Sequence, residues 1–390
     1  MAAAFLPDEL IMEILSWLPV KSLMKFRCVN KFFKTVISNP QFVEVNLKKS
    51  VRNPHLTSIL RLNYEDKQVI DWNLVTFPIS RLLENQSTSF LCYDPYYRLT
   101  NDYCRWWVVG SCNGLLCLID MLKSRSQDSR ICFWNPATRT KSEYLLPSSN
   151  NCIWFAFGYD TLAKTYKVVA FCKELDVEHG NARIGVKIFS MGNNSWRNIQ
   201  CFPMLPLDRF NNHGVYLSGT INWLALRDHS VSDLFHWNDR CTTVKQCVIL
   251  SLDLSSEKYT QLLLPRDFDK VPRYQPKLVV LMGRLCFYHD FEETHFVIWQ
   301  MKDFGAQESW IQLLKISYSN FFSPMEHKWL DLLPLYLSEN GDTLILANDH
   351  DDDEAFIYNC RDNRVKRIGI TNKILWSRTN DYVESLVSTH

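Results

Sequence analysis

The residues best suited to binding a metal lie in two polar stretches in the second half of the 390-residue chain. His289-Asp290-Phe291-Glu292-Glu293-Thr294-His295 holds two imidazoles and three carboxylates, and His350 precedes Asp351–Asp353. Such groups are ligands for zinc and calcium. Neither stretch has the His-Glu-x-x-His spacing or the cysteines of a zinc site, nor the loop glycine of a calcium-binding hand. We therefore predict no metal site, and we interpret Asp349–Glu354 as a solvated acidic loop.

Motifs for other kinds of catalysis are also missing from the sequence. It contains no phosphate-binding loop, no dinucleotide glycine fingerprint and no Gly-x-Ser-x-Gly nucleophile elbow. The 13 cysteines include no Cys-x-x-Cys pair, and many stand in apolar runs such as Leu115-Leu116-Cys117-Leu118. This pattern favours buried thiols in a reducing compartment over a disulfide framework. We predict a chain without catalytic residues or cofactor.

Composition and charge narrow the class of protein further. Hydrophobic residues make up 46% of the chain and aromatic residues 13%, which favours a strand-rich globular core. The net charge of +1 gives no footprint for nucleic acid or an anionic membrane. No apolar run is long enough for a membrane span, and Met1–Leu6 lacks the features of a signal peptide. We expect a soluble protein of the cytoplasm and/or nucleus.

The first 46 residues have helical periodicity. Leu10, Ile11, Ile14, Leu15 and Leu18 form one broad apolar stripe, which predicts a helix that begins near Pro7 and ends at Pro19. Apolar residues over 23–29 and over 32–37 predict two more short helices, the last ending at Asn39-Pro40. Three short helices cannot bury all these side chains by themselves. They must pack on the following domain or bind another protein.

These residues resemble a known family motif, the F-box of plant F-box proteins. The match runs through Leu6–Leu23, Phe26–Lys31 and Ile37–Phe42, with Asn30 in place of the usual Ser and Phe33 in place of the usual Trp. The resemblance implies binding to the C-terminal helices of a Skp1-like adaptor, although some of the apolar residues must form the unit's own core. The implied contact residues are Leu6, Pro7, Leu10, Ile11, Ile14, Leu15, Leu18, Pro19 and Leu23.

The remainder of the chain, residues 47–390, is built from repeats. One half of the repeat is a turn glycine followed by an apolar strand, as in Gly219–Leu226 and Gly283–Tyr288. The other half is a strand, a polar turn and a second strand, as in Ile131–Thr140. Copies recur about 45 to 65 residues apart, which is typical of propeller blades of four strands. Residues 55–95 would complete a sixth blade with a last strand near 380–388, and this closure would remove exposed edges.

This part also resembles the F-box-associated, kelch-like domain of plant F-box proteins. The match is carried by Trp134–Arg139, Phe157–Asp160, Tyr166–Val169 and Val186–Trp196, and extends through Gly219–Trp223 and Glu308–Trp310. We therefore predict an all-β main domain, a six-bladed kelch-like β-propeller, preceded by a small three-helix F-box. An irregular sandwich of the same hairpins is the alternative fold.

The two resemblances together imply a substrate-recognition subunit of a Skp1–cullin–F-box ubiquitin ligase. The F-box would bind the Skp1-like adaptor and, through it, a cullin and a RING subunit, while the propeller would bind an unidentified target protein. The loops 173–183, 227–244 and 317–328 are the candidate target contacts. A propeller enzyme or carbohydrate-binding module with a helical cap is one alternative, and a Skp1–F-box complex without ligase activity is another.

Overall fold

The computed structural model describes most of the chain. The described residues are 6–64, 69–84, 87–88, 96–99, 106–120, 130–146, 152–175, 182–202, 204–207, 214–227, 243–321, 330–349, 354–370 and 373–390. The chain divides into two compact units, one made of Met1–Leu146 with Asn372–His390, the other of Pro147–Thr371. The candidate target loops and the acidic stretch after Asp349 lie largely outside the described residues. Each unit is described by itself.

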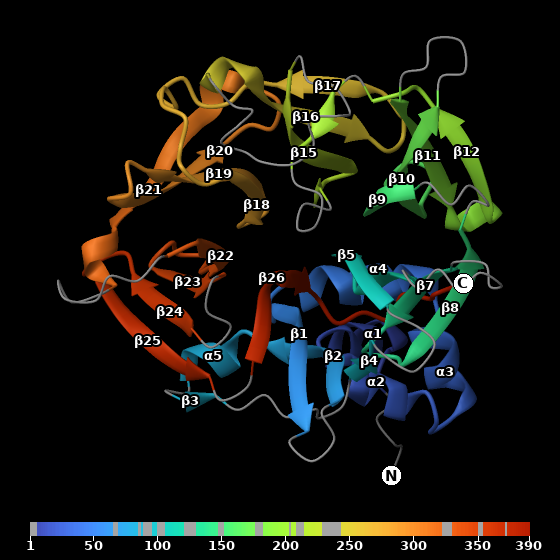
Figure 1. Ribbon diagram of the computed structural model, residues 1–390. Coiled ribbons are helices and arrows are strands. Elements are labelled where there is room, and N and C mark those ends of the chain that lie inside the picture. The colour runs from blue at the N-terminus through green and yellow to red at the C-terminus, as the bar shows by residue number, and fades with distance from the viewer. Residues whose placement is uncertain are drawn as a thin grey trace. The chain divides into compact units, whose positions relative to one another are not determined.

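Four helices open the first unit (Figure 1). Proline or asparagine stands immediately before each of them, and the side chains of Asn30 and Asn39 accept hydrogen bonds from the backbone N–H groups of Phe33 and Gln41. Pro40 occupies the first position of the last helix, where its missing N–H costs nothing. Asn39-Pro40 therefore ends one helix and starts another. The helices are α1 (Asp8–Ser16), α2 (Val20–Phe26), α3 (Lys31–Ile37) and α4 (Pro40–Ser50).

The helices share a small core of their own. Asn46 on α4 donates hydrogen bonds to the carbonyls of Ser16 (3.1 Å) and Leu18 (3.5 Å), which ties α4 to the end of α1. One apolar side chain from the far end of the sequence, Leu386, packs on the same core. The buried members of this helical core are Leu15, Leu23, Ile37 and Phe42.

Two antiparallel sheets complete the first unit (Figure 1). In the first, β26 lies at one edge and pairs with β1. The last strand of the chain and the first strand after the helices therefore belong to the same sheet. The strands of this sheet, in order, are β26 (Lys373–Tyr382), β1 (His55–Tyr64), β2 (Val69–Pro78) and β4 (Tyr96–Arg98). The second sheet contains β5 (Trp106–Cys112), β6 (Leu115–Asp120), β7 (Arg130–Asn135) and β8 (Thr140–Leu145). Helix α5 (Ser80–Glu84) and the short strand β3 (Ser87–Thr88) follow β2.

The second unit holds four further antiparallel sheets. The first two are formed by β9 (Cys152–Asp160), β10 (Thr165–Leu175), β11 (Ala182–Ser190) and β12 (Ser195–Ile199), and by β13 (Leu205–Pro206), β14 (Val215–Leu217), β15 (Thr220–Leu226), β16 (Cys247–Asp253) and β17 (Tyr259–Leu262). The other two run through β18 (Lys277–Leu281), β19 (Arg284–Phe291), β20 (His295–Met301) and β21 (Trp310–Ser317), and through β22 (Leu332–Leu337), β23 (Thr343–Asn348), β24 (Glu354–Asn359) and β25 (Arg364–Ile370). Short 3₁₀ turns at Met191–Asn193, Val244–Gln246 and Gln307–Ser309 lie between strands of the same sheet, and one at Tyr318–Asn320 follows β21. The six sheets confirm the predicted all-β, six-bladed propeller after a helical segment.

A single kind of turn explains much of the repeat seen in the sequence. In four turns an Asn or Asp ends a strand, and its side-chain oxygen accepts hydrogen bonds from the backbone N–H groups two and three residues further on. The residue four positions on has a positive φ. Short polar side chains favour such turns because they satisfy the backbone locally. The first and last residues of these turns are Asn135 and Arg139, Asp160 and Lys164, Asp253 and Glu257, and Asn359 and Asn363.

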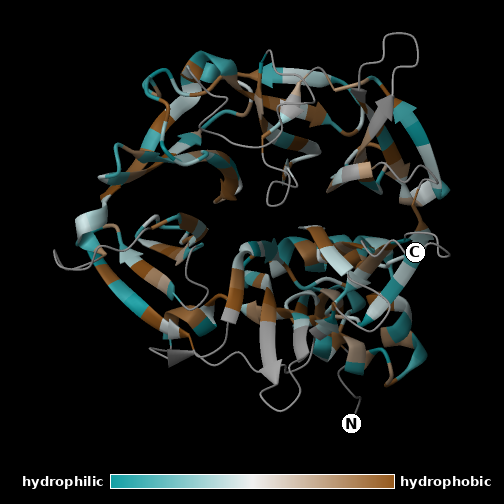
Figure 2. Cartoon of the chain, in the orientation of Figure 1, coloured by the Kyte–Doolittle hydropathy of each residue, from teal (hydrophilic) through white to brown (hydrophobic). Residues whose placement is uncertain are grey.

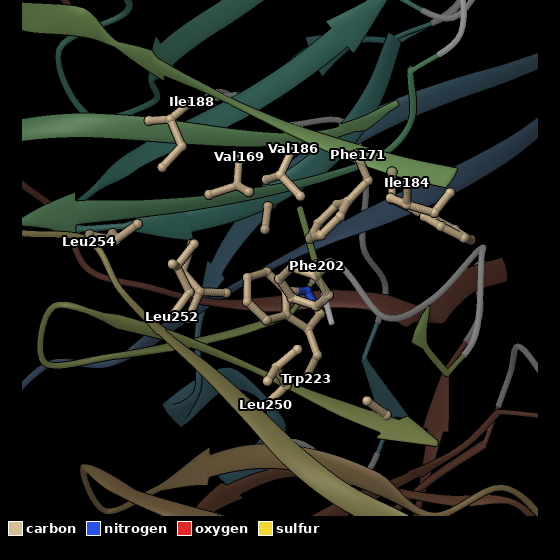
Figure 3. Packing of buried hydrophobic residues seen from close by; sticks show 14 of the residues in the cluster. Val169, Phe171, Ile184, Val186, Ile188, Phe202, Trp223, Leu250, Leu252 and Leu254 are labelled. Carbon is tan, nitrogen blue, oxygen red and sulfur yellow. The ribbon is translucent and has the colours of Figure 1, made fainter. Parts of the chain in front are cut away.

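Inner strands of the sheets are more buried than the outer strands. Strands β6 and β16 are buried almost throughout, whereas β12 and β25 are exposed at most positions. Figure 2 shows the same contrast, with the buried strands largely brown and the outer strands carrying more teal. The core between the β9–β12 and β13–β17 sheets centres on Trp223 and Phe171, whose rings meet edge to face at 5.5 Å (Figure 3). Apolar burial of this extent is the main source of stability for such sheets.

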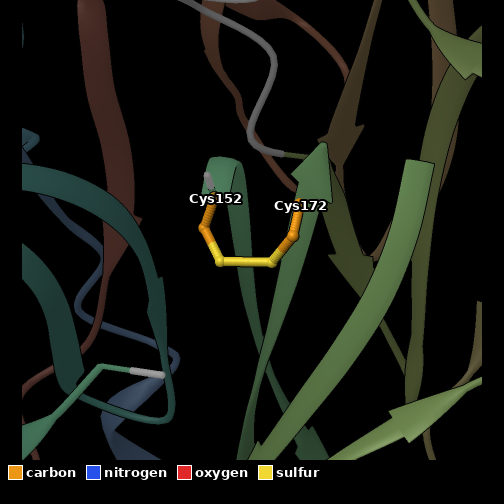
Figure 4. The surroundings of a disulfide bond; sticks show 2 residues. All are labelled: Cys152 and Cys172. Carbon is orange, nitrogen blue, oxygen red and sulfur yellow. A yellow bond between two sulfur atoms is a disulfide. The ribbon is translucent and has the colours of Figure 1, made fainter. Parts of the chain in front are cut away.

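One disulfide is present among the described residues. Cys152 on β9 and Cys172 on β10 stand directly opposite each other and are joined through their sulfur atoms (Figure 4). The two cysteines are 20 residues apart and form no recognisable spacing motif. This bond differs from the prediction, which favours buried thiols over disulfides. Five of the other described cysteines are buried, whereas Cys28 and Cys201 are exposed. Burial raises the pKa of Cys132 and Cys286 to about 12. These two thiols therefore stay protonated at neutral pH. No described helix is long and apolar enough to cross a membrane.

Candidate functional site

Helix α1 carries an outward row of apolar side chains. Leu10, Ile14 and Trp17 follow one another at intervals of four and three residues, so they lie on one face. Their side chains are 50%, 55% and 50% exposed. Leu6, just before the helix, is 56% exposed. A contiguous set of exposed large apolar side chains is costly in water and is typical of a protein-binding surface. We call Leu6, Leu10, Ile14 and Trp17 the docking face.

A second row on α1 points into the helical core. Ile11, Leu15 and Leu18 have the same spacing, offset by one residue, and all three belong to the core of the four helices. The broad apolar stripe predicted from the sequence thus consists of two rows, one exposed to solvent and one packed in the helical core. Of the predicted contact residues, the exposed ones are Leu6, Pro7, Leu10, Ile14 and Pro19; Ile11 and Leu18 are half-buried, and Leu15 and Leu23 are buried. The last two support the docking face from beneath, and partner contact stays a prediction for the set.

Trp17 is the member of the docking face that the sequence reasoning missed. Its indole N–H donates to Oε1 of Glu13 at 3.0 Å. Nζ of Lys49 stands 4.3 Å and Cζ of Arg52 4.8 Å from the ring centre, so cations from the end of α4 hold the indole in place. Hydrogen bonds from Lys49 and Trp17 lower the pKa of the Glu13 carboxyl group. The sequence offers one signal for this placement: Trp17 lies seven residues, or about two helical turns, after Leu10 and therefore on the same face.

Further exposed apolar side chains border the docking face or lie on the following helices. Met12 on α1 is 44% exposed, Val29 between α2 and α3 is 65% exposed, and Phe32 on α3 is 37% exposed. None was among the predicted contacts. Their exposure shows that the apolar surface of the helical unit extends beyond α1.

Comparison with known proteins assigns both parts of the chain. Residues 5–44 match the model of the F-box domain, and residues 77–389 match that of the F-box-associated beta propeller domain. The chain belongs to the F-box proteins with this propeller domain. An F-box/kelch-repeat protein of Arabidopsis thaliana is 30% identical over 331 residues, which is 82% of each chain. An Arabidopsis F-box protein is 28% identical over 245 residues, covering 60% of this chain and 58% of that relative. Both sequence resemblances are thereby confirmed.

Within the propeller, the family motifs around Tyr159-Asp160 and Tyr166-Lys167 form a buried charge network. Lys167 is 4% exposed, and its Nζ lies 2.7 Å from Oδ2 of Asp160 and 2.9 Å from Oε1 of Glu257. Nζ also donates to the carbonyl of Leu254. Arg197 pairs with Glu257 from the solvent side. The network joins the turn after β9 to the turn after β16, so these motif residues hold two blades together.

Acidification is expected to remove about 2 kcal/mol of this stabilisation as Asp160 becomes protonated. Burial alone would raise the pKa of Asp160, but hydrogen bonds from Lys167 and Ser255 outweigh it and lower the pKa from 3.8 to about 2. A carboxyl group with a lowered folded-state pKa stabilises the fold above its unfolded pKa and loses that contribution as the pH falls through the folded value. One pKa unit corresponds to about 1.4 kcal/mol.

Urea unfolding of the wild type and of Asp160→Asn at several pH values tests this expectation. Between about pH 5 and pH 2 the wild type should lose about 2 kcal/mol more stability than the variant, because only the wild type protonates at this position. Equal losses in the two proteins would contradict the lowered pKa.

The propeller also contains a pocket of about 270 Å³ between residues 267–273 and the β19–β20 turn. Two ion pairs flank it, Lys270 with Glu292 and Arg273 with Glu293, the second at 2.6 Å between Nη1 and Oε2. Phe268 contributes an aromatic wall. The pocket is thus a hollow with an aromatic wall and a rim of paired charges.

The predicted absence of a metal site at His289–His295 can now be compared with the geometry. The Nε2 atom of His289 accepts a hydrogen bond from Trp299 at 3.3 Å, and Nδ1 lies 2.8 Å from the carbonyl of Asp290. Nδ1 of His295 lies 2.9 Å from the hydroxyl of Thr294. Burial lowers the pKa of His289, which is therefore neutral. Among the residues that the structure describes, no group of three or more His, Cys, Asp or Glu side chains could hold a metal ion.

Proposed function

We propose that this F-box protein is the substrate-recognition subunit of a Skp1–cullin–F-box ubiquitin ligase. The docking face carries the proposal, because its apolar side chains are exposed while the residues beneath them form a closed core. A Skp1-like adaptor would cover this face and connect the chain to a cullin and a RING subunit. The chain itself would be non-catalytic, acting in the cytoplasm and/or nucleus.

The propeller would bind the target protein in this scheme. Its loops stand on rigid sheets, and loops on a rigid scaffold are the usual carriers of recognition. The pocket beside Arg273 is a candidate contact on the described part of the propeller, since arginine and aromatic side chains are frequent anchors at protein interfaces. Holding target lysines near a charged ubiquitin-conjugating enzyme would raise the rate through effective concentration alone.

Co-purification of the full chain with a Skp1-type subunit tests the proposal. We expect a stable 1:1 complex on size-exclusion chromatography, and recruitment of a cullin when one is added. A folded chain that does not bind the Skp1-type subunit would overturn the proposal. Skp1 binding without cullin recruitment would contradict the ligase role and leave a Skp1–F-box complex of another kind.

A further inference from the structure

The segment 383–390, which follows β26, has no regular secondary structure, and two of its residues are fully buried. Ser385 and Thr389 are both 0% exposed. Backbone carbonyls that are shielded from water in such an irregular segment need partners from other groups, because an unpaired buried carbonyl costs free energy. The partners of these carbonyls therefore show what the segment is built to contact.

Asn135, at the turn between β7 and β8, supplies two of those partners. Its side-chain amide donates to the carbonyls of Ser385 (3.0 Å) and Val387 (2.8 Å). The oxygen of the same side chain accepts from the N–H groups of Ala137 and Thr138, as in the other turns of this type. Asn135 is 0% exposed and uses both its donor and its acceptor groups. An aspartate could form the turn but could not hold the segment.

Two more residues of the same sheet fit closely around the segment. Ser142 on β8 donates its hydroxyl to the carbonyl of Thr389. Gly114, in the turn between β5 and β6, has φ +81°, and a Cβ atom there would overlap the side chain of Ser385 and approach the carbonyl of Val383 to 2.7 Å. The glycine is thus required by this close approach as well as by its backbone conformation.

The other side of the segment contacts the F-box helices. Leu386 lies between the two carbonyls held by Asn135, and its side chain packs against the helical core around Leu15 and Leu23. Successive residues of one short stretch therefore contact the β5–β8 sheet through the backbone and the helices through a side chain. All of these groups belong to the first compact unit.

We propose that residues 383–390 form a strap that fixes the F-box helices on the β5–β8 sheet, with Asn135 as its positioning residue. The strap stands on geometry within the first unit and needs no partner. Its consequence for ubiquitin transfer rests on the proposed function, because a receptor that works by positioning needs a fixed orientation between docking face and propeller.

Asn135→Asp tests the strap with minimal disturbance of the turn. The carboxylate can still accept from Ala137 and Thr138, but it cannot donate and it places a negative charge against two carbonyls. Asn359→Asp is the matched control, because Asn359 forms the same turn with the N–H groups of Arg361 and Asp362 but does not hold the strap. Leu386→Ser weakens the strap from its other side.

Two measurements on the full chain report the result. Hydrogen exchange in residues 383–390 should become more than tenfold faster in Asn135→Asp and in Leu386→Ser, with β18–β21 unchanged and Asn359→Asp like the wild type. Spectroscopic labels at Lys34 on α3 and Lys141 on β8, attached without cysteine chemistry, should show a broader distance distribution in both strap variants. An unchanged distribution in either folded variant would overturn the proposal.

A ligase assay separates the strap from the proposed function. If both hold, Asn135→Asp should bind the Skp1-type subunit like the wild type but transfer ubiquitin several-fold more slowly. A broader label distance distribution in the strap variants, together with a wild type that does not bind the Skp1-type subunit, would contradict the proposed function and support the strap.

Discussion

Replacing Leu10 and Ile14 together by aspartate is expected to weaken binding to a Skp1-type subunit by at least about 100-fold. Burying a leucine or isoleucine side chain is worth about 1.5 to 3 kcal/mol, so losing two such contacts costs about 3 kcal/mol or more. Each aspartate would also have to be buried without a partner for its charge. The measurement is a titration of the purified chain by calorimetry or surface plasmon resonance.

The variant should keep its fold, since both side chains are at least half exposed and lie outside the helical core. Leu162→Asp combined with Leu263→Asp is the matched control, because these leucines are 82% and 42% exposed on the propeller. The control should bind the Skp1-type subunit as tightly as the wild type. Equal affinity of the docking-face variant and the wild type would place the contact elsewhere on the chain.

The sequence predicts the helical unit well wherever local signals decide it. Apolar spacing and proline positions place α1, α2 and α3 close to their observed bounds. Helix α4 is not among the predicted helices, because Asn39-Pro40 is a stop signal for the preceding helix, although asparagine before proline is an equally good start. The sequence also does not predict which apolar residues of α1 face outward and which face inward. Both rows are apolar, and they differ only in what packs on them.

The propeller follows from repeated turn chemistry, which is local and therefore visible in a single sequence. Asn135 lies in the predicted strand–turn–strand unit Ile131–Thr140, and Asn359 stands at the same place in its own turn. The contact of Asn135 with Ser385 and Val387 links residues about 250 positions apart, and no local sequence pattern predicts it. The packing of Leu386 on the helical core is not predicted for the same reason. The disulfide joins residues only 20 positions apart, but no spacing motif marks its two cysteines. Sequence reasoning thus finds the scaffold and loses the specific long-range contacts.

Lys167→Met is expected to lower the free energy of unfolding by about 3 to 5 kcal/mol. The substitution keeps the length of the side chain but leaves Asp160, which is 2% exposed, and Glu257 facing each other without the ammonium group. Removing one partner of a buried ion pair is costly because the remaining charge has no compensation. Arg197 still neutralises part of Glu257 from the surface, so the uncompensated charge falls mainly on Asp160.

Urea unfolding at neutral pH measures the effect, and two further variants interpret it. Lys270→Met removes an exposed lysine paired with Glu292 and should lower the free energy of unfolding far less than Lys167→Met does, because surface ion pairs contribute little. Asp160→Asn in the Lys167→Met background should recover part of the loss, because it removes the buried charge that the first substitution orphaned. A cost for Lys167→Met no larger than that for Lys270→Met would show that blade packing, and not the charge network, joins these two turns.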